Sequence, residues 1–290
     1  MMRSVFQRKT TGSVVCPSCG SLVGVRDEKC YSCGRSNPGL WGFGPMLRSI
    51  GADFGFGPLV IGACVTLYVI TLLMSGSEIF QMGGILSMLA PSTPVLFLFG
   101  ASGGLPVFVA GRWWTVLSAG WLHASLLHIF MNMYWVRQMG PAMTDILGPA
   151  RTVIIYTAGG VAGFALSSLA WAYLPAIPFL HGGRITVGAS APVFGLIGAL
   201  YHYGRTSSSI AKQMAQSIII QAVIFGVIMG NAGIDNFAHL GGFGGGYFTS
   251  AFLNPMTRER GDHMLIAIGC LAATVLSIAA SVLTGFSILR

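Results

Sequence analysis

The sequence has 290 residues, of which 53% are hydrophobic and 8% are charged, with a formal net charge of +8. An ordinary soluble domain carries roughly 25% charged residues, so this composition cannot cover a water-exposed surface. Disordered chains are poor in the aliphatic and aromatic residues that are abundant here. The 41 glycines lack the three-residue period of collagen. The composition therefore predicts a helical integral membrane protein.

Four of the six cysteines form two CxxC pairs near the N-terminus, Cys16-Pro-Ser-Cys19 and Cys30-Tyr-Ser-Cys33, and a glycine follows each pair. Two such pairs on tight turns place four thiolates around one tetrahedral ion, the usual geometry of structural zinc. The short gap between the pairs indicates a small ribbon, similar to the zinc ribbons at one end of many bacterial proteins. Two disulfides or four unbound thiols are the alternatives, and a cytoplasmic compartment disfavours the disulfides.

Seven apolar runs approach the length of about 20 residues that a helix needs to cross a bilayer. We expect spans at about 57–75, 121–139, 151–173, 188–204, 213–231, 235–253 and 263–288. The segment 79–112 is apolar, but prolines and glycines interrupt it. We interpret this segment as a long interfacial loop and not as an eighth span.

The distribution of Lys and Arg predicts a cytoplasmic N-terminus. With that orientation, 13 of the 16 basic residues fall in cytoplasmic segments, and only Arg112, Arg184 and Arg290 lie outside. This topology and anionic lipid account for the net positive charge without a nucleic-acid partner. The first ten residues, MMRSVFQRKT, lead into a polar segment and do not resemble a signal peptide.

Three of the expected spans carry polar side chains, which are costly in a bilayer and therefore functional hypotheses. The second span has His123, which we expect near the outer surface, and His128 and Asn132, which share one helix face. The fourth span opens with Ser190, and the sixth contains His239. Each of these groups alone is readily explained by a hydrogen bond to its own or a neighbouring helix.

Ridges of small residues change this interpretation. They recur at four-residue spacing on the fourth and sixth spans: Ala191, Gly195 and Ala199, and Ala238, Gly242 and Gly246. Such ridges let two helices approach closely. The approach would bring Ser190 and His239 together, and a hydroxyl beside an imidazole is a nucleophile–base arrangement.

The residues around Ser190 predict a helix N-terminus. Gly188 permits a sharp turn, and Pro192 suits the first helical turn. Free backbone amides and the helix dipole at that position favour a developing oxyanion. His128 and Asn132 are further candidate donors to the same oxygen.

Three motifs together resemble the rhomboid intramembrane serine proteases: GASA with Ser190, AHLGG with His239, and WLHASLLHIFMN with His123, His128 and Asn132. The resemblance runs from about 97 to 253 and includes LFGASG and GRWW. It implies a rhomboid-like six-helix core and leaves the ribbon and the seventh span outside it, so we expect an all-α polytopic membrane protein with a C-terminal seventh transmembrane helix. The expected division is a zinc-ribbon-like segment at 1–36, a linker at 37–56, the six-helix core at 57–253 and the extra helix at 254–290.

The resemblance also implies the activity, a serine endopeptidase that uses a Ser–His dyad to cleave transmembrane or membrane-proximal segments of membrane proteins. Ser190 would be the nucleophile and His239 its general base. His128, Asn132 and the Ser190 amide would form the oxyanion hole, and Phe194 would pack on the His239 ring. No cofactor is implied for catalysis. His123 matches a position more structural than catalytic.

The sequence departs from the family pattern at two positions. Ala191 follows the serine where the family usually has glycine, and Trp114 is followed by Thr115, not by arginine, with Arg112 upstream. Asp235 lies four residues before His239. We interpret Asp235 as a helix cap and not as a third catalytic residue.

Two alternatives stay open beside the protease. A rhomboid-like pseudoprotease would bind membrane helices without cutting them, although its usual signature is loss of the serine or the histidine. A haem protein could use His123 and His128, but two histidines five apart on one helix cannot clamp a haem axially. We expect membrane-protein substrates, the lipid bilayer and a cytosolic partner of the ribbon as contacts, in a bacterial plasma membrane.

Overall fold

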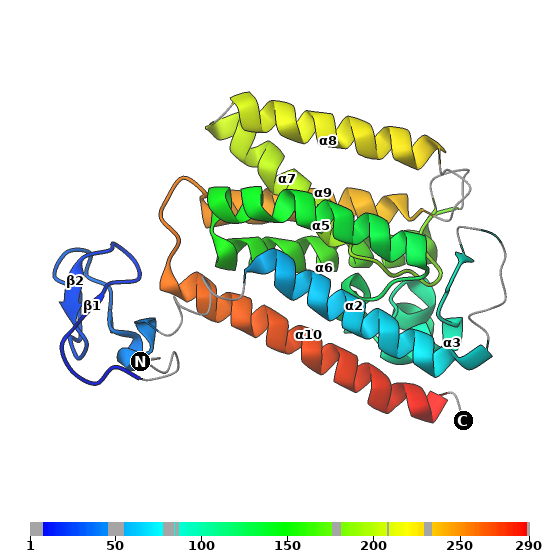
Figure 1. Cartoon of the computed structure of the whole chain (residues 1–290), viewed down its shortest axis with the longest axis horizontal. Helices are drawn as coiled ribbons and strands as arrows, with labels where there is room; N and C mark the ends of the chain where they lie inside the picture. Colours follow the sequence, from blue (N-terminus) through cyan, green and yellow to red (C-terminus); the bar gives the residue numbers. More distant parts are fainter. Residues whose placement is uncertain are drawn as a thin grey trace.

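The computed structural model describes residues 8–45, 55–77, 84, 87–175, 181–207, 209–228 and 234–288, without the side chains of 222–228 and 287–288. A body of long helices carries a small two-stranded ribbon at one end (Figure 1). The expected all-α fold with an N-terminal ribbon is confirmed.

The ribbon consists of β1 (Ser13–Val15) and β2 (Leu22–Gly24), which pair antiparallel with Val14 opposite Val23. Three valines and two of the cysteines form its small core: Val14, Val23, Val25, Cys16 and Cys30. A core this small cannot stabilise a domain by burial alone, so a further cross-link is needed.

The start of the expected linker packs on the ribbon. The 3₁₀ turn η1 (Leu40–Gly42) buries Leu40, and the Lys9 amide donates to the Gly42 carbonyl at 3.0 Å. The chain up to 45 therefore belongs structurally with the ribbon. The rest of the expected linker up to 54 lies outside the described residues.

Long helices occupy the positions of all seven apolar runs. They are α2 (Phe56–Ser75), α5 (Leu126–Leu147), α6 (Pro149–Tyr173), α7 (Ser190–Thr206), α8 (Ser209–Ile228), α9 (Asn236–Leu253) and α10 (Gly261–Ile288). Within the described residues, three segments are long and apolar enough to cross a membrane by length and composition: Phe56–Ser75, Pro149–Tyr173 and Gly261–Phe286. The predicted end of the fifth run, 229–231, is outside the described residues.

The second helix starts later than its apolar run. Ser125 caps α5, because its hydroxyl accepts a hydrogen bond from the His128 amide at 3.3 Å, and the helix continues through Pro141 to Leu147. His123 thus precedes the helix. It is fully buried within the protein, and its expected position near the outer membrane surface stays a prediction.

The described part of the segment 79–112 contains only short helices, and none is long enough to be an eighth span. These are α3 (Thr93–Phe99) and the π-helical turn η4 (Leu105–Val109); α4 (Thr115–Ser118) and the 3₁₀ turn η5 (Ala119–Trp121) follow. Their position at the membrane interface stays a prediction.

Helices α6, α7 and α9 pack most closely, and glycines make this possible. A Cβ atom added to Gly246 would lie 1.8 Å from the Gly195 carbonyl oxygen, and one added to Gly242 would lie 2.2 Å from the Ala191 oxygen. On the other side of α7, a Cβ on Gly159 would lie 2.8 Å from the Gly195 Cα. The close approach predicted from the two ridges is confirmed.

Helix α10 lies against α3, α4 and α6 and runs from the ribbon toward the C-terminus (Figure 1). The ribbon contacts its first turn. Arg35 forms an ion pair with Asp262, and the Gly261 amide donates to the Pro17 carbonyl at 3.2 Å.

We predict that Gly246→Val destabilises the protein, because the new side chain would overlap the backbone of α7. Overpacking of this kind costs about 1–3 kcal/mol, so the thermal unfolding temperature in detergent should fall by several degrees. Gly244→Val is the matched control on the same helix, since a Cβ there meets nothing within 4 Å. Equal unfolding temperatures for the two variants would contradict the prediction.

Candidate active site

Ser190 and His239 meet between α7 and α9. Ser190 is the first residue of α7, and His239 lies in the first turn of α9. The Ser190 Oγ and His239 Nε2 atoms are 2.9 Å apart, which is a hydrogen bond in which the hydroxyl can donate to the ring. The two residues are 49 positions apart in the sequence, so the packing of the two helices brings them together.

The turn before Ser190 needs a glycine. Gly188 has a φ of +133°, and its amide donates to the Ala119 carbonyl at 2.9 Å. A Cβ atom at Gly188 would lie 2.6 Å from His128 Nε2. The chain therefore passes directly against the His128 ring just before the nucleophile candidate.

His128 has the tautomer that an oxyanion donor needs. The Ala124 amide donates to its Nδ1 at 3.3 Å, so a neutral ring carries its hydrogen on Nε2. Nε2 is the nitrogen next to Gly188 and on the side of Ser190. The Ser190 amide lies in the first helical turn, where amides lack an intrahelical acceptor. Both groups can donate to an oxygen near Ser190 Oγ.

Asn132 is buried one turn after His128, on the same face of α5. Its Nδ2 donates to the His128 carbonyl at 3.0 Å. Among the described residues, no hydrogen bond joins Asn132 to Ser190. In this structure the amide is therefore bonded to its own helix, next to the site.

Phe194 stacks on the imidazole ring of His239. The Phe194 and His239 ring centroids are 4.3 Å apart, and the planes differ by 10°. Phe194 lies one turn after Ser190 on α7, so the helix that carries the hydroxyl also supports the imidazole.

Asp235 caps α9. Its Oδ1 accepts a hydrogen bond from the Ala238 amide at 2.9 Å, and its Oδ2 accepts one from the Ser167 hydroxyl. Ser167 also accepts from the Gly183 amide at 2.9 Å. Both carboxylate oxygens thus accept hydrogen bonds from groups other than His239. No sequence pattern points to Ser167, since a serine in an apolar span usually bonds to its own helix.

His123 packs edge-on against His128, with ring centroids 5.2 Å apart and an interplanar angle of 65°. Within the described residues, neither of its ring nitrogens has a hydrogen-bond partner. Two rings in contact with each other cannot lie on opposite faces of one haem. The geometry therefore does not fit the haem alternative.

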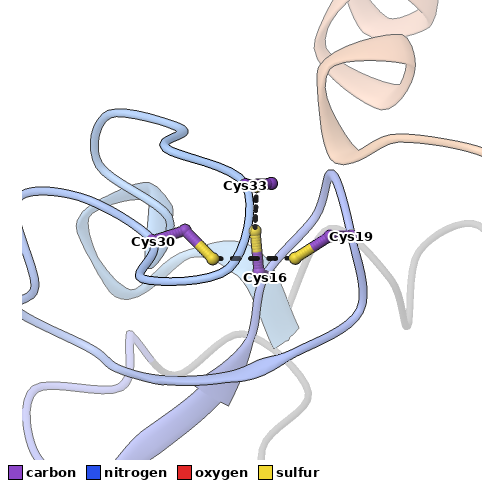
Figure 2. A group of neighbouring side chains, drawn as sticks. All are labelled: Cys16, Cys19, Cys30 and Cys33. Atoms are coloured by element: carbon purple, nitrogen blue, oxygen red, sulfur yellow. Dashed lines mark hydrogen bonds between the residues drawn. The ribbon is translucent and has the colours of Figure 1, made fainter.

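The four N-terminal cysteines point their sulfur atoms at one another (Figure 2). All four Sγ atoms lie within 4.8 Å of one another, with Cys16 and Cys33 at 3.8 Å and Cys19 and Cys30 at 3.6 Å. Zinc–sulfur bonds of about 2.3 Å in a tetrahedron give sulfur–sulfur separations of about 3.8 Å. The cluster fits one metal ion. All four thiols are free, so the two-disulfide alternative does not describe this structure.

The two CxxC pairs adopt the same turn. Gly20 and Gly34 have φ values of +82° and +71°, and their amides donate to the Cys16 and Cys30 carbonyls at 3.0 and 2.9 Å. The predicted role of the two glycines in tight turns is confirmed. A side chain would be strained at either position.

Polar neighbours of the cluster favour an ionised ligand and hold the ribbon in place. Hydrogen bonds with the hydroxyl and the amide of Ser21 lower the pKa of the Cys19 thiol to about 6. Arg35 donates to the Ser18 hydroxyl at 2.9 Å and also pairs with Asp262 at the start of α10. Arg35, two residues after the last ligand, therefore connects the cluster to the helical body.

The chain is similar to known proteins over its helical part. A family profile of the rhomboid domain matches residues 110–256, which include α4 to α9 and leave the ribbon, α2 and α10 outside. "RHOMBOID-like protein 7" of Arabidopsis thaliana is 32% identical over 169 residues, 57% of this chain and 51% of that protein. "RHOMBOID-like protein 4" of the same plant is 32% identical over 163 residues, 55% of this chain and 39% of its own length.

A bacterial relative gives the same result. "Rhomboid protease GluP" of Bacillus subtilis is 29% identical over 189 residues, 63% of this chain and 34% of that protein. The chain thus matches about half or less of the length of these three relatives. The family match nevertheless covers half of the chain and contains Ser190, His239, His128 and Asn132. The chain belongs to the rhomboid family.

Proposed function

We propose that the protein is an intramembrane serine endopeptidase that hydrolyses a peptide bond in or near a transmembrane helix of a membrane-protein substrate. Membership of the family implies either a protease or a pseudoprotease. The 2.9 Å hydrogen bond between Ser190 and His239 is the observation that favours the protease over the pseudoprotease. A pseudoprotease has no need of a hydroxyl aligned on an imidazole at a helix N-terminus.

In the proposed mechanism, Ser190 Oγ attacks the substrate carbonyl carbon while His239 Nε2 takes the hydroxyl proton. The negative charge that forms on the carbonyl oxygen accepts hydrogen bonds from the Ser190 amide and from His128 Nε2. His239 then protonates the leaving amine as the peptide bond breaks. A water molecule hydrolyses the acyl-enzyme by the same proton transfers in reverse order.

Two contacts hold the base in position without a third catalytic residue. The stacked Phe194 ring limits rotation of His239, and the Asp235 cap fixes the first turn of α9. Both contacts act on the orientation of the imidazole, which is the task of the third residue in a triad.

The methyl group of Ala191 is compatible with this mechanism. It is buried and points toward α6, since a Cβ added to Gly163 would lie 2.9 Å from the Ala191 Cβ. The close contact with α9 at this level is made by the Ala191 backbone oxygen, against Gly242. The extra methyl thus fills space left by a glycine on α6 and does not separate α7 from α9.

A fluorophosphonate probe tests the proposal directly, because it reacts only with an activated serine. We expect the detergent-solubilised protein to be labelled, and Ser190→Ala and His239→Ala to be unlabelled although folded. Ser168→Ala is the matched control, since the Ser168 hydroxyl is buried and donates to the Phe164 carbonyl of its own helix. Absence of labelling in folded wild type would instead favour the pseudoprotease.

The two oxyanion candidates should differ in effect. We predict that His128→Ala lowers kcat/KM by about 100-fold to 1,000-fold, the range for loss of one such donor. Asn132→Ala should have a smaller effect, about 10-fold, because its amide is bonded to the His128 carbonyl. The kcat/KM of each variant on the same transmembrane substrate shows which substitution has the greater effect. A greater loss in Asn132→Ala would mean that the amide turns toward the oxyanion.

We further propose that Cys16, Cys19, Cys30 and Cys33 hold one structural zinc ion, supported by sulfur separations that fit a tetrahedral site. Metal analysis of the purified protein should give about one zinc per chain, and Cys30→Ser with a chelator should remove it and make residues 8–45 sensitive to protease. Cys270→Ser is the control, since that thiol lies on α10. Unchanged zinc content in Cys30→Ser would contradict the assignment.

The remaining expectations are proposals of the same kind. The protein would lie in a bacterial plasma membrane with its N-terminus and ribbon in the cytoplasm, where the ribbon would bind a cytosolic partner. The division into segments 1–36, 37–56, 57–253 and 254–290 would correspond to ribbon, linker, rhomboid core and additional helix.

A further inference from the structure

Arg112 is a buried cation that joins the loop before the active site to α10. Only 1% of the residue is exposed. Its Nη1 donates to the Phe97 carbonyl at 2.8 Å, and its Nη2 donates to the Ser281 carbonyl at 2.6 Å. The guanidinium also lies over the Phe97 ring, 4.4 Å from its centroid. A buried charge with these partners holds together the elements that supply them, because moving either element away removes an acceptor from the buried guanidinium.

Trp114 makes two further hydrogen bonds to the same helix. Its indole Nε1 donates to the Ser281 hydroxyl at 3.1 Å, and its carbonyl accepts from the Ser277 hydroxyl at 2.7 Å. Ser277 and Ser281 are one turn apart and buried, whereas Val275, Leu276 and Leu283 are exposed on α10. The polar face of α10 therefore points at the loop.

The packing around these bonds leaves no free space. Gly100, at the end of α3, has a φ of +99°, and a Cβ there would lie 2.7 Å from the Ser281 hydroxyl oxygen. One turn further along α10, a Cβ on Gly285 would lie 3.2 Å from the Leu98 Cα. α10 and the end of α3 are in close contact, so the loop cannot move away from α10 without breaking several interactions.

A short path leads from Trp114 to the nucleophile candidate. Trp114 is followed directly by α4 and η5, and the Ala119 carbonyl accepts the Gly188 amide at 2.9 Å, two residues before Ser190. A second connection runs in parallel. Ser102 and Thr186 exchange two backbone hydrogen bonds of 3.0 and 2.8 Å, just upstream of Ser190.

We propose that α10, which lies outside the matched rhomboid domain, positions the active site through Ser277 and Ser281. These two residues would hold Trp114 and Arg112, and the segment that follows would hold Gly188 and the turn of Ser190. They are positioning residues and do not touch the substrate. The inference rests on the proposed protease function.

A double-mutant cycle on the bond between the Trp114 indole and the Ser281 hydroxyl tests the proposal. Trp114→Phe and Ser281→Ala should each slow fluorophosphonate labelling of Ser190 by about 3-fold to 10-fold, the range for one buried hydrogen bond. The double variant should be no slower than the slower single variant, because both changes remove the same bond. Normalising each rate to the folded fraction separates positioning from a loss of stability.

Thr274→Val is the matched control. Thr274 is also a buried hydroxyl of α10, but it donates to the Cys270 carbonyl of its own helix at 3.0 Å. The control should therefore be labelled at the wild-type rate. Wild-type labelling of Ser281→Ala and Trp114→Phe, or additive effects in the double variant, would overturn the proposal.

Hydrogen exchange gives a readout that does not depend on catalysis. Ser281→Ala should speed exchange of the Gly188 and Thr186 amides, and Thr274→Val should not. If the wild-type protein were unlabelled, the protease proposal would fail, and this exchange measurement would still decide whether α10 positions the turn. Unchanged exchange at both amides would overturn the positioning role.

Discussion

The geometry of the site depends on one contact, the approach of α7 and α9 to a distance at which no side chain fits between them. A Cβ on Gly246 would overlap the carbonyl of Gly195, so the two backbones touch. Lipid tails are as apolar as leucine side chains, and helix association in a bilayer therefore depends on close packing and not on burial of apolar surface. Because Ser190 and His239 both lie in the first turns of these helices, the contact places hydroxyl and imidazole within hydrogen-bond distance.

Two buried arginines connect the additional helix α10 to the rest of the helical body. Arg112 bonds to the Ser281 carbonyl on the last turns of α10, and Arg151 bonds to the Thr257 carbonyl at 2.8 Å just before its first turn. The Arg151 amide donates to Glu259 at 2.7 Å, and burial raises the pKa of that carboxyl. Carbonyl oxygens accept hydrogen bonds from both guanidinium groups, as buried charges require, although Arg112 Nε has no partner among the described residues. α10 is thus fixed at its two ends by opposite ends of the core.

The sequence predicted the long helices and the pair Ser190 and His239, because apolar runs and small-residue ridges are local patterns. The helix boundaries were predicted less accurately, since the start of α5 depends on the cap by Ser125 and not on hydrophobicity. The direction of the Asn132 amide was also unpredictable, because its acceptor on its own helix competes with the site. The contacts of α10 with Trp114 join residues more than 160 positions apart, and no spacing rule connects them.

The departure from the family pattern at Thr115 goes together with a guanidinium that reaches α10 from Arg112. The family resemblance leads one to expect an arginine directly after Trp114, but Thr115 is completely buried and donates to the Arg112 carbonyl at 2.8 Å. An arginine at that position would have no space for its side chain. The guanidinium comes instead from two residues before Trp114, where it reaches both α3 and α10. The loop is thus held by protein on both sides, with α3 on one side and α10 on the other.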